Sequence, residues 1–118
     1  MHWLQVHAAD DLLISDWVVT EVSSALSIKL RRGDIDLAER ATALASFNRM
    51  CVDTLTVLPV TTSQFQNAAN FCDLHDLGLR GSDALHLAIA ADHGATLVTA
   101  DRPFREAALA LGVAAESP

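Results

Sequence analysis

The fold is decided by one stretch of the chain, GLRGSDALHLAIAADHGATLVTADRPFREAALALGV, which occupies residues 78–113. Ser82 is a typical N-cap residue, and the almost wholly apolar run that follows it towards His93 and Gly94 predicts a buried helix. Residues 95–99, ATLVT, are apolar and β-branched, which predicts a buried strand that ends just before Asp101. With the residues after Pro103, the stretch therefore predicts helix, strand, helix.

Acidic residues stand at both turns of this unit. Asp83 lies in the first turn of the predicted helix, and Asp101 follows the predicted strand. In open parallel α/β sheets, ligands bind outside the carboxyl ends of the strands, so both side chains are candidates for one crevice. Taken singly, Asp83 is equally explained by the helix dipole and Asp101 by an ordinary turn. Their joint placement favours a site.

The same stretch resembles the C-terminal half of PIN-domain proteins, and among them most closely the VapC-type toxins of bacterial toxin–antitoxin pairs. The resemblance is carried by LRGSDALHLA at 79–88, GATLVTAD at 94–101, and AA at 107–108 with LGV at 111–113. It joins two acids to the helix and strand between them. The segment TEVSSAL at 20–26 resembles the PIN-domain segment that carries a functional glutamate, which here is Glu21.

Glu21 has two interpretations. It lies early in a helix predicted from about Trp17 to Arg32, after a short strand predicted at residues 11–15. An acid in this position is stabilised by the helix dipole, with its side chain in water. The resemblance implies instead that Glu21 is the third member of an acidic pocket, and we favour that interpretation.

The remaining segments predict alternating helices and strands in a single domain, residues 1–118. We expect the following elements: the end of a helix at 1–9, a helix at 36–50 with a capping box from Asp36 and Glu39, a strand at 55–60, and a helix capped by Thr61 or Thr62 that runs to about residue 75. This alternation predicts an α/β fold with a mostly parallel sheet. The resemblance implies a three-layer α/β/α PIN-like domain.

The formal net charge of −7 opposes nucleic-acid binding unless basic residues gather locally. Arg80, Arg102 and Arg105 flank the two C-terminal acids and are candidates for phosphate contacts, although ordinary surface arginines explain them as well. Cys51 and Cys72 are expected to be free core thiols.

Membrane and secretion signals are missing from the sequence. No apolar run approaches the ~18 residues of a membrane span, and the first residues lack the features of a signal peptide. We therefore expect a cytoplasmic protein that does not enter a membrane.

Converging carboxylates repel one another unless a proton or a divalent cation neutralises them, and hard oxygen ligands suit Mg²⁺ or Mn²⁺. The resemblance implies a metal-dependent ribonuclease whose acids hold the cation. By position these are Glu21, Asp83 and Asp101, which we expect to gather at one sheet edge as catalytic and metal-binding residues. The remaining candidates, expected to orient the site or bind substrate, are Thr99, Arg80, Arg102 and Arg105.

The resemblance also implies partners: an RNA substrate, a cognate antitoxin whose basic residue enters the acidic pocket, and a second copy of the chain in a homodimer. The same acids serve an alternative, a catalytically impaired PIN-like module that only binds or dimerises, or a gene fragment. The sequence does not separate these functions.

The chain departs from the family pattern at its start. PIN domains open with a central strand that ends in an Asp, and the resemblance here begins only after that strand. We therefore expect an N-terminally truncated domain in which the strands at residues 12–15 and 96–99 border an empty central position. Direct pairing of these strands is expected to be poor, which predicts low stability or self-association.

Overall fold

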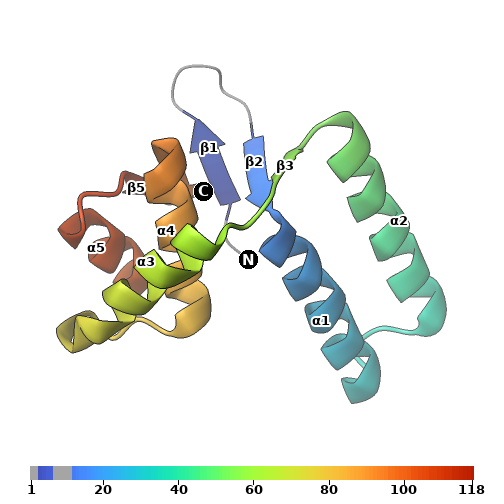
Figure 1. The fold of residues 1–118 in the computed structure, drawn as a ribbon. Coiled ribbons are helices and arrows are strands. Elements are labelled where there is room, and N and C mark those ends of the chain that lie inside the picture. The colour runs from blue at the N-terminus through green and yellow to red at the C-terminus, as the bar shows by residue number, and fades with distance from the viewer. Residues whose placement is uncertain (1–2, 7–11) are drawn as a thin grey trace.

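The chain folds into one five-stranded sheet with helices packed around it, in a computed structural model that describes residues 3–6 and 12–118 (Figure 1). In chain order the elements are β1 Trp3–Val6, β2 Leu12–Ser15, α1 Asp16–Arg32, α2 Leu37–Asp53, β3 Thr56–Leu58, α3 Thr62–Asp73, a 3₁₀ turn His75–Leu77, α4 Gly81–His93, β4 Ala95–Val98, α5 Arg102–Ala110 and β5 Ala115–Glu116. The strand order across the sheet is β3-β2-β1-β4-β5.

Strand directions confirm the predicted α/β fold with a mostly parallel sheet. β2 pairs in parallel with β3, and β4 pairs in parallel with β5. β1 is antiparallel to both of its neighbours, β2 and β4. Four strands therefore share one direction, and their carboxyl ends lie at one edge of the sheet.

The centre of the sheet differs from the sequence-based expectation. Residues 3–6 were predicted to belong to the end of a helix, but they form β1, which occupies the position that was expected to be empty. Leu4 is registered with Leu13 on one side and with Leu97 on the other. Because buried backbone N–H and C=O groups need partners, the unfilled positions on β2 and β4 outweigh the local preference of this short segment. The other residues of the predicted helix end lie outside the described part of the chain.

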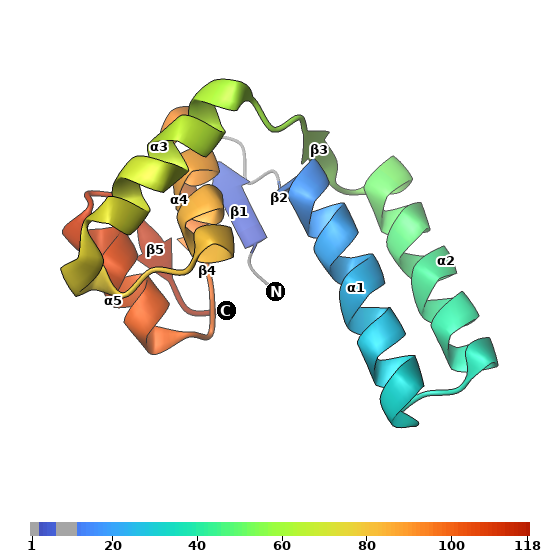
Figure 2. The ribbon, with the colours of Figure 1, turned by 60° about the horizontal axis from the view of Figure 1, so that its bottom comes forward.

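The hydrophobic core has two parts. The larger part surrounds α4, whose residues from Ala84 to Ala90 are all buried, and includes Leu97, Phe104 and Val113. The smaller part lies beneath α1 and α2 and contains Ile14, Val18, Val22, Phe47 and Leu55. The α1–α2 pair extends away from the body formed by α3, α4 and α5 (Figure 2). The sheet joins the two parts.

The ends of the helices follow local sequence signals, with one exception. The predicted capping box of Asp36 and Glu39 is present, and Thr61 forms a second one with Gln64. Ser82, however, is not the N-cap of α4. That position belongs to Arg80, which gives no side-chain cap, and the hydroxyl of Ser82 has a different partner described below.

No helix in the described residues is long and apolar enough to cross a membrane. The most apolar helix, α4, has 13 residues, whereas a span needs about 20. Its apolar side chains face the protein core instead.

The central position of β1 is tested by a proline at Gln5, which is registered with Leu12 and with Thr96. Gln5→Pro removes a backbone N–H from the middle of the sheet, and we expect it to lower the free energy of unfolding by about 1–3 kcal/mol in urea denaturation. Gln5→Thr is the control, because it keeps the N–H and favours a strand. Equal stability of the two variants would show that this segment is not paired.

Candidate active site

Two of the three predicted acids line one cavity. Asp83 comes from the first turn of α4, and Asp101 lies between β4 and α5, past the carboxyl end of β4. The cavity has a volume of about 360 Å³, and its other lining residues are Leu77, Gly78, Leu79, Arg80, Pro103 and Phe104. Sequence positions 83 and 101 thus meet at the predicted sheet edge.

Asp101 has a structural role as well as a place in the cavity. Its Oδ1 accepts a hydrogen bond from the backbone N–H of Phe104 at 3.1 Å, which caps α5. Its own N–H donates to Oγ1 of the buried Thr99 at 3.1 Å. A carboxylate has two oxygens and about four acceptor positions, so capping through Oδ1 is compatible with a second ligand.

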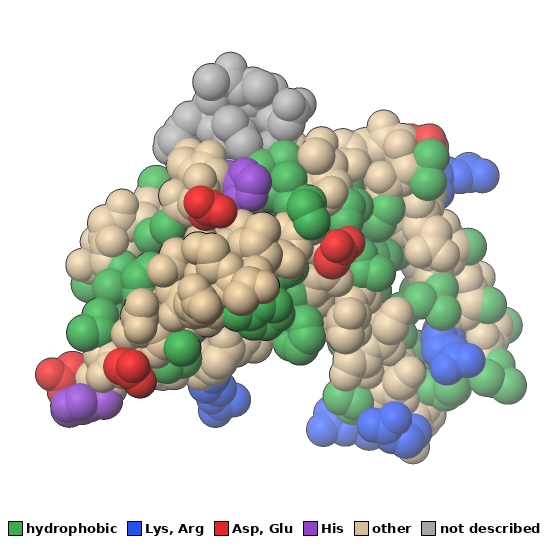
Figure 3. All heavy atoms as spheres, viewed as in Figure 1, with side chains coloured by type: hydrophobic (Ala, Val, Ile, Leu, Met, Phe, Trp, Pro, Cys, Tyr) green, Lys and Arg blue, Asp and Glu red, His purple; other side chains and the backbone are tan. Residues whose placement is uncertain are grey.

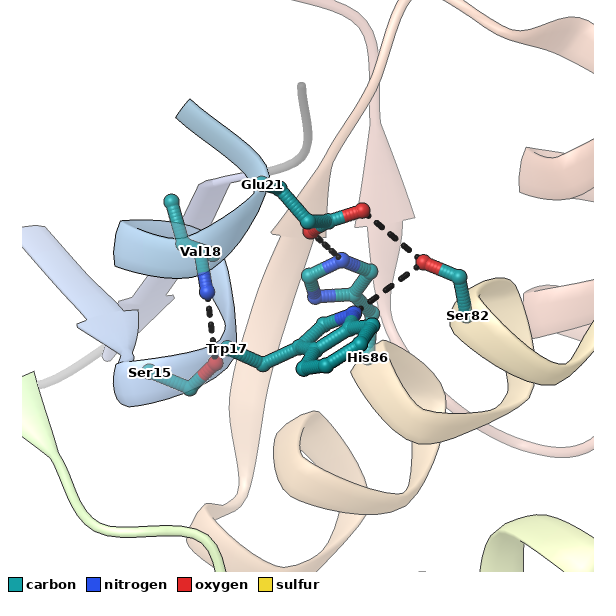
Figure 4. A network of polar contacts seen from close by, with 6 residues as sticks. All are labelled: Ser15, Trp17, Val18, Glu21, Ser82 and His86. Carbon is teal, nitrogen blue, oxygen red and sulfur yellow. Dashed lines mark hydrogen bonds and ion pairs between the residues drawn. The ribbon is translucent and has the colours of Figure 1, made fainter. Parts of the chain in front are cut away.

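Glu21 is held by Ser82 and His86 of α4 (Figure 4), and it is not among the residues that line this cavity. Its Oε1 lies 2.6 Å from Nε2 of His86, and its Oε2 accepts a hydrogen bond from the Ser82 hydroxyl at 2.9 Å. With Glu21 ionised, Nε2 of His86 carries the hydrogen and donates it. The Ser82 oxygen in turn accepts from the indole N–H of Trp17 at 3.2 Å.

The expectation that all three carboxyl groups lie close enough to share one cation is wrong for this arrangement. Among the described residues, no group of three or more His, Cys, Asp or Glu side chains is placed to hold a metal ion. Glu21 lines a separate hollow with Trp17, Thr20, Ser24, Ala25 and Ser82. The physical reason is that Ser82 and His86, one helical turn apart, offer two donors to the carboxylate.

The predicted substrate-binding residues have different surroundings. Arg80 is exposed and lines the cavity with the two aspartates. The Arg105 Nη1 donates to the carbonyl oxygen of Thr99 at 2.8 Å, and the Arg102 Nε pairs with Glu106 at 3.2 Å on the surface. Thr99 is 2% exposed, so it supports the loop rather than meeting a substrate. Of the four, Arg80 is the one best placed to contact a phosphate.

The roles of Trp17 and Ser82 were missed from the sequence. His86 is fully buried and contacts Glu21, so it is a packed, hydrogen-bonded histidine. The four-residue spacing of Ser82 and His86 signals that they share a helix face, but it does not identify the helix that faces them.

The donor chemistry of the cavity fits a small divalent cation. Mg²⁺ is commonly bound by one or two carboxylates, with water and substrate phosphate oxygens completing the octahedron. Asp83 and Asp101 supply the carboxylates, and the cavity leaves room for water. These two residues are the candidates to hold the ion.

Comparison with known proteins gives one match. A family model described as "PIN domain" matches residues 3–109 of the chain. No curated protein and no solved structure matches the chain. The matched range includes β1, all three acids and the cavity.

The capping role of Asp101 predicts that its negative charge can be removed without loss of the hydrogen bond that caps α5. Asp101→Ala should lower the free energy of unfolding by ~1 kcal/mol, whereas Asp101→Asn, which keeps an acceptor oxygen, should remain within a few tenths of the wild type. Urea denaturation followed by circular dichroism measures both. If the two variants lose the same stability, the bond to Phe104 does not stabilise α5.

Proposed function

Because the chain belongs to the PIN-domain family, whose members are generally nucleases, we propose that it is a metal-dependent endoribonuclease of the VapC toxin type. The observation that carries this proposal is the meeting of Asp83 and Asp101, from different elements, in one cavity at the carboxyl edge of the sheet. The substrate of such an enzyme is an RNA phosphodiester, and the proposal includes action on cellular RNA in the cytoplasm.

In this proposal Asp83 and Asp101 hold Mg²⁺ or Mn²⁺. The chemistry supplied by a cation in such a site is polarisation of a phosphodiester oxygen and of a water molecule. Arg80, on the wall of the same cavity, attracts the phosphate and orients it towards the two aspartates. Thr99 and Arg105 act indirectly, because their hydrogen bonds fix the loop that carries Asp101.

The charge distribution limits how RNA approaches. Figure 3 shows basic side chains gathered at the free end of the α1–α2 pair, where Lys29, Arg31 and Arg32 occupy the last turn of α1. Acidic side chains are scattered over both parts of the molecule in the same view. With a net charge of −7, binding rests on local contacts such as Arg80, and we expect it to weaken steeply with salt.

Two protein partners belong to the same proposal. A cognate antitoxin would neutralise the enzyme by placing a basic side chain between Asp83 and Asp101, where the cation and the substrate bind. A second copy of the chain would form a homodimer. Exposed apolar side chains on or near α3, namely Phe65 at 53% and Leu74 at 51% exposure, support an interface between proteins.

A catalytically impaired PIN-like binding module is the second candidate. It is favoured by the position of Glu21, whose two carboxylate oxygens are bonded to Ser82 and His86 and which does not join Asp83 and Asp101 in one cluster. In that case the acidic cavity serves as a docking point for a basic partner residue.

Charge removal at the cavity separates the two functions. Asp83→Asn and Asp101→Asn should each reduce Mg²⁺-dependent cleavage of a labelled RNA by on the order of 100-fold or more, because even the loss of a residue that only hydrogen-bonds to a metal ligand costs about 10–100-fold. Asp53→Asn, an exposed carboxylate at the end of α2, is the matched control.

Chelation by EDTA should abolish cleavage by the wild type, and added Mg²⁺ or Mn²⁺ should restore it. Cleavage that persists in EDTA, or that is equal in wild type and Asp83→Asn, would refute the proposal of a metal-dependent nuclease with Asp83 in its active site. A wild type that binds no divalent cation and cleaves no RNA would favour the binding module.

A further inference from the structure

The carboxylate of Glu21 is fixed at both oxygens by one face of α4 (Figure 4). His86 contacts Oε1 at 2.6 Å, and Ser82 donates to Oε2 at 2.9 Å. Ser82 has a single hydroxyl hydrogen, which goes to Glu21, and its oxygen accepts from Trp17 at 3.2 Å. The orientation of the Ser82 hydroxyl is therefore set from both sides.

The buried donor, His86, is not placed to take part in chemistry directly. His86 is 0% exposed, so neither RNA nor bulk water reaches its ring. Its contact with Glu21 gives it a route by which it can affect a reaction. The Glu21 side chain, by contrast, is 32% exposed and lines an open hollow, so it is within reach of water.

The held carboxylate keeps acceptor capacity. A carboxylate has about four acceptor positions, of which Ser82 and His86 use two. Ser82 immediately precedes Asp83 in the first turn of α4, so the same turn that carries Asp83 also anchors Glu21. Glu21 is thus held beside the acidic cavity without being part of it.

We propose that Ser82 and His86 are positioning residues for Glu21. They hold its carboxylate where it hydrogen-bonds water at the reaction centre without ligating the cation. This inference rests on the proposed nuclease function. It gives Glu21 a role distinct from that of Asp83 and Asp101, and it assigns a function to a buried histidine and a serine outside the cavity.

Metal affinity and turnover, measured separately, test this assignment. Glu21→Gln, Ser82→Ala and His86→Ala should each lower kcat for RNA cleavage by ~10–100-fold, the range seen when a hydrogen-bonding residue around a metal site is lost. The Kd for Mn²⁺, measured by calorimetry, should stay within about 2-fold of the wild type in all three, because the direct ligands are untouched. Asp83→Asn should instead weaken Mn²⁺ binding.

Rescue and control variants separate positioning from folding. His86→Gln places an amide N–H near the position of Nε2 and should restore most of kcat, whereas His86→Ala should not. Asp92→Ala is the control, because it removes a 2.8 Å contact between α4 and the buried Gln64 of α3, remote from Glu21. It should lower the melting temperature and leave kcat unchanged. Ser82→Ala, at a half-buried position, keeps the test valid if His86→Ala fails to fold.

The outcomes are distinguishable. Weaker Mn²⁺ binding by Glu21→Gln, equal to that of Asp83→Asn, would make Glu21 a direct ligand and overturn the positioning role alone. Unchanged kcat in folded Ser82→Ala would overturn it as well. A wild type without metal-dependent cleavage would overturn the proposed function, and this inference with it.

Discussion

The hydrogen-bonding demand of β2 and β4 is the constraint on which the rest of the structure depends. Both strands present buried backbone groups towards the centre of the sheet, and β1 satisfies both sides from one short segment. This pairing sets the separation of the two strands. β2 leads directly into α1 and Glu21, while β4 leads to Asp101. The distance between the two halves of the candidate site is therefore fixed by β1, a strand that lies outside the cavity.

Polar contacts between α1 and α4 also link the two parts of the hydrophobic core. α1 belongs to the smaller hydrophobic cluster, and α4 lies at the centre of the larger one. Glu21 and Trp17 of α1 meet Ser82 and His86 of α4 through three hydrogen-bonded contacts. Partly buried bonds of this kind are costly to break singly, because each leaves a polar group unsatisfied. The network therefore restrains α1 relative to α4 while it holds the Glu21 carboxylate in place.

Local sequence signals predicted the parts of the fold that depend on local physics. The apolar run of α4, the β-branched β4 and the capping box of Asp36 and Glu39 were all evident from spacing and residue type. The sequence-based predictions failed where contacts with residues distant in the sequence determine the structure. β1 is a strand because of β2 and β4, and Ser82 leaves its expected capping role because Glu21 and Trp17 approach it. For the same reason, the convergence of Asp83 and Asp101 followed from the parallel sheet, whereas the separate position of Glu21 did not.

The central proposal is that Asp83 and Asp101 form a divalent-cation site that Glu21 does not join. Titration of ¹⁵N-labelled protein with Mn²⁺, followed by paramagnetic broadening of amide signals, tests it most directly. The account predicts that the signals of the cavity wall, including Gly78, Leu79 and Phe104, broaden first, and that those of residues 34–50 in and before α2 broaden last. Broadening centred elsewhere, or none at Mn²⁺ concentrations that suffice for other carboxylate sites, would contradict it.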